Sequence, residues 1–343
     1  MPYYNPLKQF NKDERLRTIN NLLTLRKQLD RDIPQKTATE TLLLATWNIR
    51  EFGDNRRTES LYYIAEIISR FDLVAVQEVS SNLAGLENLV SLLNLNWDYF
   101  VTDSTDGSAG GGERMAFLYD KSKLSFKKMA GEIVLPKDKL INGSLQFART
   151  PYCIAFQAGW FKFVLTTVHI YYGTTSSTDK ATREKEIDTI TSILSKRAKK
   201  EGTSYVLLGD FNIPNVNDDT MKALEKYGFA VPAAIKEHPS DLGGTSHYDQ
   251  IAFNLQLDKT MTVFSENEQR AGAFNYTESV YSEQDLETYR EYFADKIQGK
   301  TDKEIKTYYL TKWRTFQMSD HLPLWVELKI DFSDEYLVKL SNA

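Results

Sequence analysis

The sequence is poor in cysteine: its 343 residues include only Cys153. A single cysteine excludes a disulfide framework within the chain, which favours a reducing compartment. Cys153 lies in an apolar stretch without a neighbouring histidine, so we expect a buried, unreactive thiol. The N-terminus carries no apolar segment of the signal-peptide kind. We therefore expect a cytoplasmic protein, or a secreted one if a leader has been removed.

Long apolar runs and a strong excess of either charge are also missing. No run approaches the roughly 18 residues that span a bilayer, so we expect no stable membrane association. With 42 Lys and Arg against 47 Asp and Glu, the net charge is -5. This acidic balance argues against a protein that coats polyanions in general, because such proteins are usually basic. It does not exclude an enzyme that binds a few phosphates beside a bound cation. No internal repeat is present, and no protein partner can be inferred.

The chain divides into a main domain with extensions at both ends. Hydrophobic residues form 41% of it, enough for a sizeable core. At near-helical spacing, residues 11–33 carry Leu16, Ile19, Leu23, Leu29 and Ile33. We expect this helix to pack on the domain body, with a partner-binding arm as the alternative. The predicted division is an N-terminal helical extension and linker at 1–40, a main domain at 41–330 containing an insertion at 265–317, and a C-terminal tail at 331–343.

From residue 42, strands alternate with helices and hairpins. Apolar runs predict strands at 42–46, 73–76, 115–119, 153–156, 163–168, 205–208, 250–253 and 324–328. The clearest helices are predicted at 61–69 and 185–199, with a further one at 284–296. The glycine-rich segment 107–112 is predicted to be a turn at the rim of a cleft. This alternation favours an α/β fold with two sheets and helices outside them.

The strand at 205–208 ends in polar residues that suit a phosphate site. Gly209 lets the chain leave the sheet, and Asp210 and Asn212 follow at the carboxyl end, where α/β sheets place ligands. Alternate residues point the same way, so both can face one pocket. Such a segment can also be a simple Asx-type turn. Polar residues recur where other strands end or begin, and this recurrence indicates a site; they are Asn48, Arg50, Glu78 and His169 at strand ends, and Asp249, Asp320 and His321 at or before strand starts.

The oxygen-bearing side chains among these suit a hard divalent cation. Mg²⁺ prefers carboxylate oxygens and keeps several waters. Glu78, Asp320 and the amide oxygen of Asn48 are the predicted ligands. Mn²⁺ is an alternative, and Ca²⁺ an auxiliary ion.

The remaining residues suit phosphodiester hydrolysis, which needs a water nucleophile, a base and charge stabilisation at phosphorus. His321 with Asp249 behind it would supply a base of fixed tautomer. His169 with a carboxylate partner would stay cationic or protonate the leaving group. Arg149 adds a permanent cation whose geometry matches a phosphate.

Taken together, these segments resemble the endonuclease/exonuclease/phosphatase superfamily over about residues 41–330. The segments are Trp47-Asn48-Ile49, Gln77-Glu78, Gly209-Asp210-Phe211-Asn212 and Ser319-Asp320-His321. The resemblance implies a four-layer α/β sandwich, in which two face-to-face, mostly antiparallel β-sheets are flanked by helices. It also implies Mg²⁺-dependent phosphodiester hydrolysis.

Among the branches, the sequence most resembles the DNase I-like nucleases. Glu113 matches the acid that pairs with the first catalytic histidine, here His169. Arg149 lies in Phe147-Ala148-Arg149-Thr150-Pro151, which matches the phosphate-contacting arginine loop. Asp249 lies in His247-Tyr248-Asp249-Gln250-Ile251, which matches the segment supporting the second histidine, here His321. Arg50 matches a groove-facing position. Catalytic roles are thereby implied for His169, His321, Asp210, Asn212, Asp249 and Glu113, and phosphate binding for Arg149, Arg50 and Asn212.

Two departures weaken docking in a duplex minor groove. Ser80 stands where these nucleases carry a groove arginine, and Gly111 where they carry a stacking tyrosine. The insertion could instead offer aromatic surfaces for single-stranded bases. Its aromatic residues are Tyr276, Tyr281, Tyr289, Tyr292, Tyr308, Tyr309 and Trp313. The alternative is that they form the insertion's own core.

The leading prediction is a divalent-metal-dependent nuclease that acts on nucleic acid, with DNA favoured over RNA. The first alternative is a phosphoesterase of the inositol-phosphate or sphingomyelin type. Tyr248-Asp249-Gln250 replaces the Cys-Asp-Arg segment of the inositol-phosphate phosphatases, which counts against that branch. The second alternative is a non-catalytic binding module on the same fold. Such modules usually lose a ligand, whereas every expected position is filled here.

Overall fold

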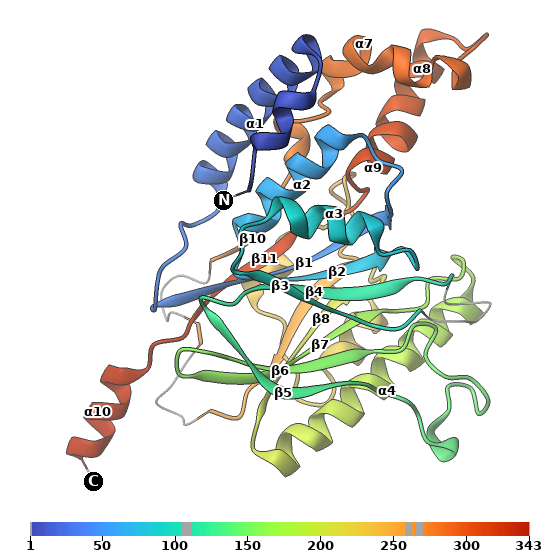
Figure 1. Ribbon diagram of the computed structural model, residues 1–343. Helices are drawn as coiled ribbons and strands as arrows, with labels where there is room; N and C mark the ends of the chain where they lie inside the picture. Colours follow the sequence, from blue (N-terminus) through green and yellow to red (C-terminus); the bar gives the residue numbers. More distant parts are fainter. Residues whose placement is uncertain (1, 105–110, 258–262, 265–269, 343) are drawn as a thin grey trace.

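Two β-sheets lie face to face between helices, as the sequence predicts. The computed structural model describes residues 2–104, 111–257, 263–264 and 270–342 (Figure 1). The first sheet holds, in spatial order, β10 (Ala271–Ala273), β11 (Leu324–Lys329), β1 (Thr41–Phe52), β2 (Leu73–Val79), β4 (Arg114–Asp120) and β3 (Trp97–Val101). The second holds β5 (Leu124–Glu132), β6 (Tyr152–Ala158), β7 (Phe161–His169), β8 (Ser204–Asp210) and β9 (Asp249–Asn254).

Each sheet combines antiparallel pairs with one parallel pair. In the described part of the chain the parallel pairs are β1 with β2 and β7 with β8. The carboxyl ends of these four strands therefore lie at matching edges of the two sheets. This arrangement confirms the mostly antiparallel four-layer α/β sandwich.

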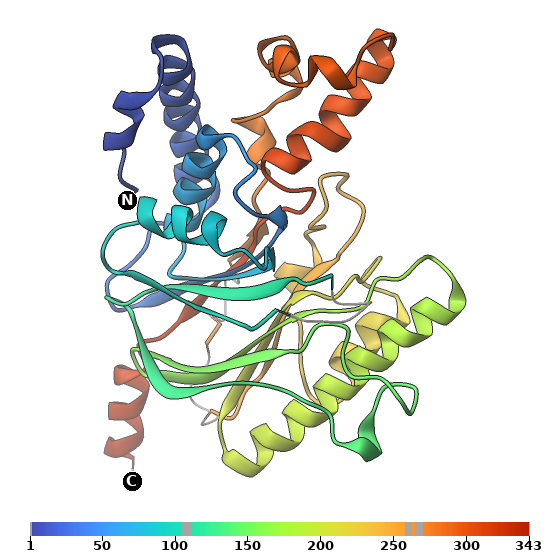
Figure 2. The same ribbon diagram turned by 45° about the vertical axis from the view of Figure 1, so that its right-hand side comes forward.

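Helices cover the outer faces of both sheets. In Figure 2, α2 (Thr58–Ser69) and α3 (Ala84–Leu92) lie over the first sheet. Against the second sheet lie α4 (Ser177–Glu201) and α5 (Asp219–Glu225). The other helices are α1 (Lys12–Asp32), α6 (Ala233–Lys236), α7 (Leu286–Tyr289), α8 (Asp302–Tyr308), α9 (Arg314–Gln317) and α10 (Ser333–Ser341). None of the described helices is long and apolar enough to cross a membrane.

Alternation along β1 divides its side chains between two cores. Leu42 and Leu44 pack between the sheets, where Phe156 and Leu165 face them from the second sheet. The intervening Leu43 packs on the other face, against the helices. Each side chain buried in this way contributes roughly 1.5–3 kcal/mol. Because both faces of β1 are covered, its sequence reads as a continuous apolar run.

The N-terminal helix α1 packs on α2. Asn11 caps it by accepting a hydrogen bond from the backbone N–H of Glu14 at 2.9 Å. Its buried apolar residues are Leu22, Leu25 and Leu29. The predicted apolar stripe is wrong at Leu16 and Leu23, which are exposed, because the helix turns a different face toward α2.

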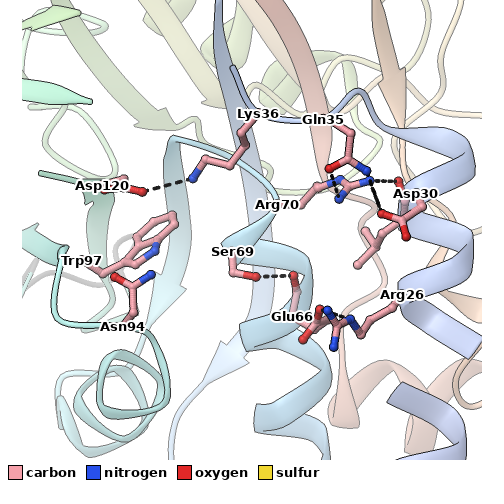
Figure 3. A pocket seen from close by; sticks show the side chains of 11 residues that line it. Arg26, Asp30, Gln35, Lys36, Glu66, Ser69, Arg70, Asn94, Trp97 and Asp120 are labelled. Atoms are coloured by element: carbon pink, nitrogen blue, oxygen red, sulfur yellow. Dashed lines mark hydrogen bonds and ion pairs between the residues drawn. The ribbon is translucent and has the colours of Figure 1, made fainter. Parts of the chain in front are cut away.

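Charged pairs reinforce the contact between α1 and α2. Arg26 pairs with Glu66 at 3.3 Å, and Arg70 of the main domain pairs with Asp30 at 2.8 Å. These residues line a cavity of about 510 Å³, in which Lys36 also pairs with Asp120 at 3.3 Å (Figure 3). The cations of this cavity therefore already face carboxylates, and they join the N-terminal extension to the main domain.

The insertion is built from β10 and short helical segments. The helix predicted at 284–296 is wrong as a continuous element, because 283–285 and 290–296 are 3-10 turns on either side of α7. Phe293 leaves the helical region at φ -135° and packs its ring on Trp313, with 5.3 Å between centroids. Residues 265–269 of the predicted insertion and 107–110 of the predicted glycine-rich turn lie outside the described residues.

Most of the insertion's aromatic rings are buried in one core that they share with α1, α2 and the first sheet. Those of Tyr276, Tyr281, Tyr289, Tyr309 and Trp313 are buried. Tyr289 also packs toward α1, where Arg17 lies 5.1 Å from its ring centroid. Because these rings are buried, they cannot stack on nucleic-acid bases. Their role is structural.

Candidate active site

Polar side chains from both sheets meet where the parallel strand pairs end. In the first sheet, β1 carries Asn48 and β2 carries Glu78. In the second sheet, the register aligns His169 of β7 with Asp210 of β8, and Asp210 with Asp249 of β9. Asp210 therefore lies between a histidine and an aspartate on neighbouring strands.

Gly209 permits this close approach of β7 and β8. Its φ of +135° is strained for any residue with a side chain. A Cβ at this position would lie 2.0 Å from the carbonyl oxygen of Val168. Glycine therefore fixes the point at which β8 delivers Asp210 to the site.

Asp210 is the centre of the cluster and is 2% exposed. Its Oδ2 accepts a hydrogen bond from Asn48 Nδ2 at 3.0 Å, which joins the two sheets. The same oxygen lies 3.6 Å from His169 Nε2 and 3.9 Å from His321 Nε2. Its Oδ1 accepts from the backbone N–H of Asn212 at 2.8 Å. One carboxylate therefore faces both predicted histidines.

His169 is held by the partner that the sequence assigns to it. Its Nδ1 lies 2.9 Å from Glu113 Oε2, while Arg149 Nη2 donates to Glu113 Oε1 at 2.7 Å. Burial opposes ionisation of Glu113, but the hydrogen bond and charge of His169, with Arg149, lower the Glu113 pKa to about 2. Burial lowers the pKa of His169, but the bond to Glu113 and the negative charges of Asp210 and Glu113 together outweigh this, and its pKa is raised.

His321 is held in the same way by Asp249, which is fully buried. The distance between His321 Nδ1 and Asp249 Oδ2 is 2.7 Å. Burial lowers the pKa of His321, but the charges of Asp249 and Asp210 raise it well above its ordinary value. Burial also raises the pKa of Asp249, against the opposing effect of His321. We place the shared proton on His321, because its second nitrogen faces another carboxylate, Asp210.

The backbone of His321 is fixed by residues that the sequence-based argument did not single out. Its N–H donates to Ser319 Oγ at 3.0 Å, and its carbonyl accepts from Trp47 Nε1 at 3.0 Å. Ser319 Oγ also donates to the carbonyl of Asn48 at 2.6 Å. Tyr276 of the insertion contacts both the N–H and the carbonyl of Ser319. Trp47 and Ser319 adjoin predicted residues in sequence, whereas the sequence places Tyr276 only among the aromatic residues of the insertion and indicates no contact with His321.

Glu78 and Asn48 are suited to hold a divalent cation. Glu78 Oε1 accepts from Asn48 Nδ2 at 2.9 Å, and its Oε2 accepts from the backbone N–H of Glu51 at 2.8 Å. Asn48 Oδ1 is buried without a hydrogen-bond partner. A buried, unpaired amide oxygen beside a carboxylate matches the ligand preference of Mg²⁺.

Asp320 is the predicted ligand that the structure does not join to this pair. Its side chain is exposed, and it forms no hydrogen bond or ion pair with Glu78 or Asn48. Among the described residues, no three His, Cys, Asp or Glu side chains cluster as a metal site. A direct role for Asp320 therefore stays a prediction.

The three predicted phosphate-binding residues differ in how their side chains are hydrogen-bonded to the rest of the protein. Arg50 Nη1 donates to Thr315 Oγ1 at 2.7 Å, which ties it to α9 rather than to the open site. Asn212 adopts a φ of +53° and donates from Nδ2 to the carbonyl of Ile170 at 2.8 Å. Arg149 is bound to Glu113 and lies beside His169, so it is the best placed of the three.

Beneath the site, a polar contact joins the sheets within their apolar interface. Gln77 is fully buried, and its Nε2 donates to Thr167 Oγ1 of β7 at 2.9 Å. Gln77 also bonds Thr46 of β1. Since these residues adjoin Glu78, His169 and Asn48 in their strands, this contact fixes the spacing of the site's two halves.

This geometry is accompanied by similarity to known proteins. A model of the Endonuclease/Exonuclease/phosphatase family matches residues 45–263. The chain belongs to this family. As a family member it has the fold of a phosphoester hydrolase, and Glu113, His169 and Asp249 lie within the matched region, whereas His321 lies beyond it.

Individual relatives are more distant. Deoxyribonuclease-1 of Rattus norvegicus is 34% identical over 92 residues, which cover 25% of this chain and 32% of that protein. The chain thus matches about a third of the length of this curated relative. A family protein from Bacteroides thetaiotaomicron has a TM-score of 0.52 at 15% identity, covering 86% of this chain and 98% of that one. A mannosyl-6-phosphatase from the same organism has a TM-score of 0.51 at 15% identity, with 84% and 99% covered.

Proposed function

We propose that this family member is a divalent-metal-dependent nuclease that cleaves phosphodiester bonds by in-line attack of an activated water. The observation that carries the proposal is the convergence of His169 and His321 on Asp210. Each histidine has its own acid behind it, the partly exposed Glu113 for His169 and the buried Asp249 for His321. A carboxylate between two imidazoles can hold a water, while the imidazoles face the charge that develops on phosphorus.

In the proposed mechanism, Asp210 orients the attacking water and accepts its proton. His321 has a raised pKa, which favours a cation that stabilises the phosphoryl oxygens over the basic role expected from sequence. The raised pKa of His169 likewise favours its cationic form, which can donate a proton from Nε2 to the leaving oxygen, since Glu113 holds its Nδ1. Arg149 adds fixed positive charge beside His169.

Glu78 and the free Oδ1 of Asn48 would hold the metal. A bound Mg²⁺ supplies Lewis-acid polarisation of the phosphoryl oxygens and offsets their negative charge. The hydrogen bonds from Asn48 Nδ2 and Glu51 N–H keep the Glu78 carboxylate in place, one on each of its oxygens.

Similarity to deoxyribonuclease-1 supports a nucleic-acid substrate and favours DNA. The second candidate is a phosphoesterase acting on a small phosphorylated molecule. The fold shared with a mannosyl-6-phosphatase is the observation that favours it.

A cleavage panel separates these functions. Single- and double-stranded DNA and RNA, an inositol phosphate, sphingomyelin and mannose 6-phosphate would be incubated with the protein and Mg²⁺, Mn²⁺, Ca²⁺ or EDTA. We expect nucleic acid to be cut in Mg²⁺ and spared in EDTA. His321→Ala and Glu78→Gln should each lower the rate by roughly a hundredfold or more.

His238→Ala is the matched control, because His238 makes no side-chain hydrogen bond with the site and is expected to leave the rate unchanged. A folded His321→Ala protein that cuts DNA as fast as the wild type would overturn the proposal. Turnover of mannose 6-phosphate without cleavage of nucleic acid would favour the second candidate.

A further inference from the structure

A cavity of about 390 Å³ opens beside Glu78. Its lining residues are Glu51, Gly53, Asp54, Asn55, Glu78, Val79, Ser80, Ser81, Gly111, Gly112, Glu113 and Phe316. Four of them are acidic, and none is lysine or arginine. The cavity therefore adjoins the hydrolytic centre but has the opposite electrostatic character to a phosphate-binding groove.

This charge pattern limits what the cavity can accept. Proteins that track a nucleic-acid backbone neutralise its phosphates with lysine and arginine. Carboxylates would repel a second phosphate, even where a metal at Glu78 offsets part of the charge. Carboxylate and serine oxygens instead accept hydrogen bonds from amino groups. An uncharged group that carries N–H donors therefore fits this cavity better than a further length of backbone.

Phe316 gives the cavity its one aromatic surface. The ring belongs to α9 of the insertion and is partly exposed, in contrast to the buried rings nearby. The guanidinium of Arg56 lies 5.5 Å from the centroid of Phe316 and 5.4 Å from that of Phe52. Arg56 itself is 7% exposed and donates to the carbonyl of Glu51 at 3.0 Å.

These contacts hold the Phe316 ring in place before any substrate arrives. A ring packed against a buried, hydrogen-bonded arginine has little freedom to lose when a planar group stacks on it. The ring also lies on the same cavity as Glu78, which adjoins the proposed scissile phosphate. In a nucleic-acid substrate, the planar group closest to that phosphate is the base of a flanking nucleotide.

We propose that this cavity holds one unpaired nucleobase next to the scissile phosphate, stacked on Phe316. The inference rests on the proposed nuclease function and names its substrate class as single-stranded nucleic acid. A base in a duplex is already paired and stacked, so it would have to leave its helix to enter. Stacking on an aromatic side chain tolerates every base, whereas the carboxylates favour bases with an exocyclic amino group.

The test uses a single-stranded DNA oligonucleotide in which only one linkage is a phosphodiester and the others are phosphorothioates. Two matched oligonucleotides replace the base on one or the other side of that linkage with an abasic tetrahydrofuran. For the wild type in Mg²⁺, we expect one of the two replacements to lower kcat/KM roughly tenfold, mainly through KM.

Phe316→Leu should show the same roughly tenfold loss on the intact oligonucleotide and no further loss on the abasic one. Phe316→Tyr should behave as the wild type. Leucine retains apolar packing against Arg56, and thermal unfolding would verify that the variant is folded. Trp160→Ala is the matched control, because Trp160 is an exposed aromatic residue between β6 and β7, at the opposite end of β7 from His169.

Equal cleavage of intact and abasic oligonucleotides by the wild type would overturn the inference and leave the nuclease function standing. The same holds if Phe316→Leu retains the wild-type preference. If the wild type cuts no oligonucleotide under any metal condition, the nuclease function itself fails, and the inference with it.

Discussion

At the scale of single residues, the site depends on where protons reside. His169 and His321 are both placed against carboxylates, and both have a pKa above the ordinary 6.5. A raised pKa means that each imidazole keeps its proton to a higher pH than a free histidine does, and loses it as the pH rises through the raised value. Asp210, between them, is then the group available to accept the proton of a water.

This assignment predicts the pH dependence of activity. Since the mechanism needs cationic histidines, kcat/KM should stay level through neutral pH and fall in the alkaline range. Asp249→Asn removes the carboxylate that raises the pKa of His321, so the alkaline fall should move to lower pH. The measurement is kcat/KM against pH on a labelled oligonucleotide. An alkaline fall at the same pH in both proteins would contradict the assigned role of Asp249.

Glu113 predicts an acid-dependent stability. Its pKa of about 2, against an ordinary 4.5, corresponds to at most roughly 3 kcal/mol in the free energy of unfolding. Because the folded-state pKa is lowered, this contribution is fully present above pH 4.5 and is lost as the pH falls through about 2. In urea titrations, Glu113→Gln should be less stable than the wild type at neutral pH and approach it at low pH. A stability difference that does not change with pH would rule out this linkage.

At the scale of elements, the central strands are the part that sequence predicts best. Strands such as β1 and β8 are covered on both faces and read as unbroken apolar runs. The strands that the sequence leaves out, β3, β5 and β10, all lie at sheet edges. Edge strands carry polar residues toward solvent; β5, for example, is exposed at most of its positions. Their pairing depends on the neighbouring strand more than on their own composition.

The residues of the site also differ in how well the sequence predicts them. Residues on strand ends, such as Asp210 and Glu78, follow directly from strand prediction and from the family resemblance. Phe316 and Tyr276 come from the insertion, whose short segments carry no clear periodicity. Their approach to the site is a result of tertiary packing, which local sequence does not encode.

Tyr276 provides a test of how the insertion supports the site. Its hydroxyl contacts the backbone of Ser319, which in turn positions His321. Tyr276→Phe should lower the free energy of unfolding by about 1 kcal/mol. It should also lower kcat more than it raises KM, because it disturbs His321 and not a substrate contact.

Tyr292→Phe is the matched control, since Tyr292 is exposed and makes no hydrogen bond with the site's backbone. If Tyr276→Phe lost stability without any change in kcat, Tyr276 would be a structural residue only.

At the scale of the whole molecule, both sheets contribute residues to one site. Asn48 and Glu78 come from the first sheet, while His169, Asp210 and Asp249 come from the second. Their relative position is set by the apolar interface between the sheets and by the contact of Gln77 with Thr167. The helices outside the sheets contact the edges of the site, where Arg183 of α4 donates to the carbonyl of Asn212 at 3.1 Å.

Urea should therefore abolish cleavage before it removes secondary structure. Loosening of the sheet interface separates Asn48 from Asp210, whose hydrogen bond spans 3.0 Å, while each sheet can still keep its own ladder. We expect the midpoint for loss of activity to lie below the midpoint for loss of far-UV circular dichroism. Gln77→Met, which removes the donor to Thr167, should widen that gap. Coincident midpoints in both proteins would show that the sheets separate and unfold as one unit.

The Asn48–Asp210 hydrogen bond has a consequence for how the sequence of such a protein can change during evolution. The residues proposed to bind the metal and those proposed to transfer protons come from separate sheets, and the Asn48 amide hydrogen-bonds across them to Asp210. Edge strands and the N-terminal extension can then be altered without disturbing that hydrogen bond. New substrate contacts can be added around an unchanged reaction, so relatives of this chain can differ in what they bind while cutting the same kind of bond.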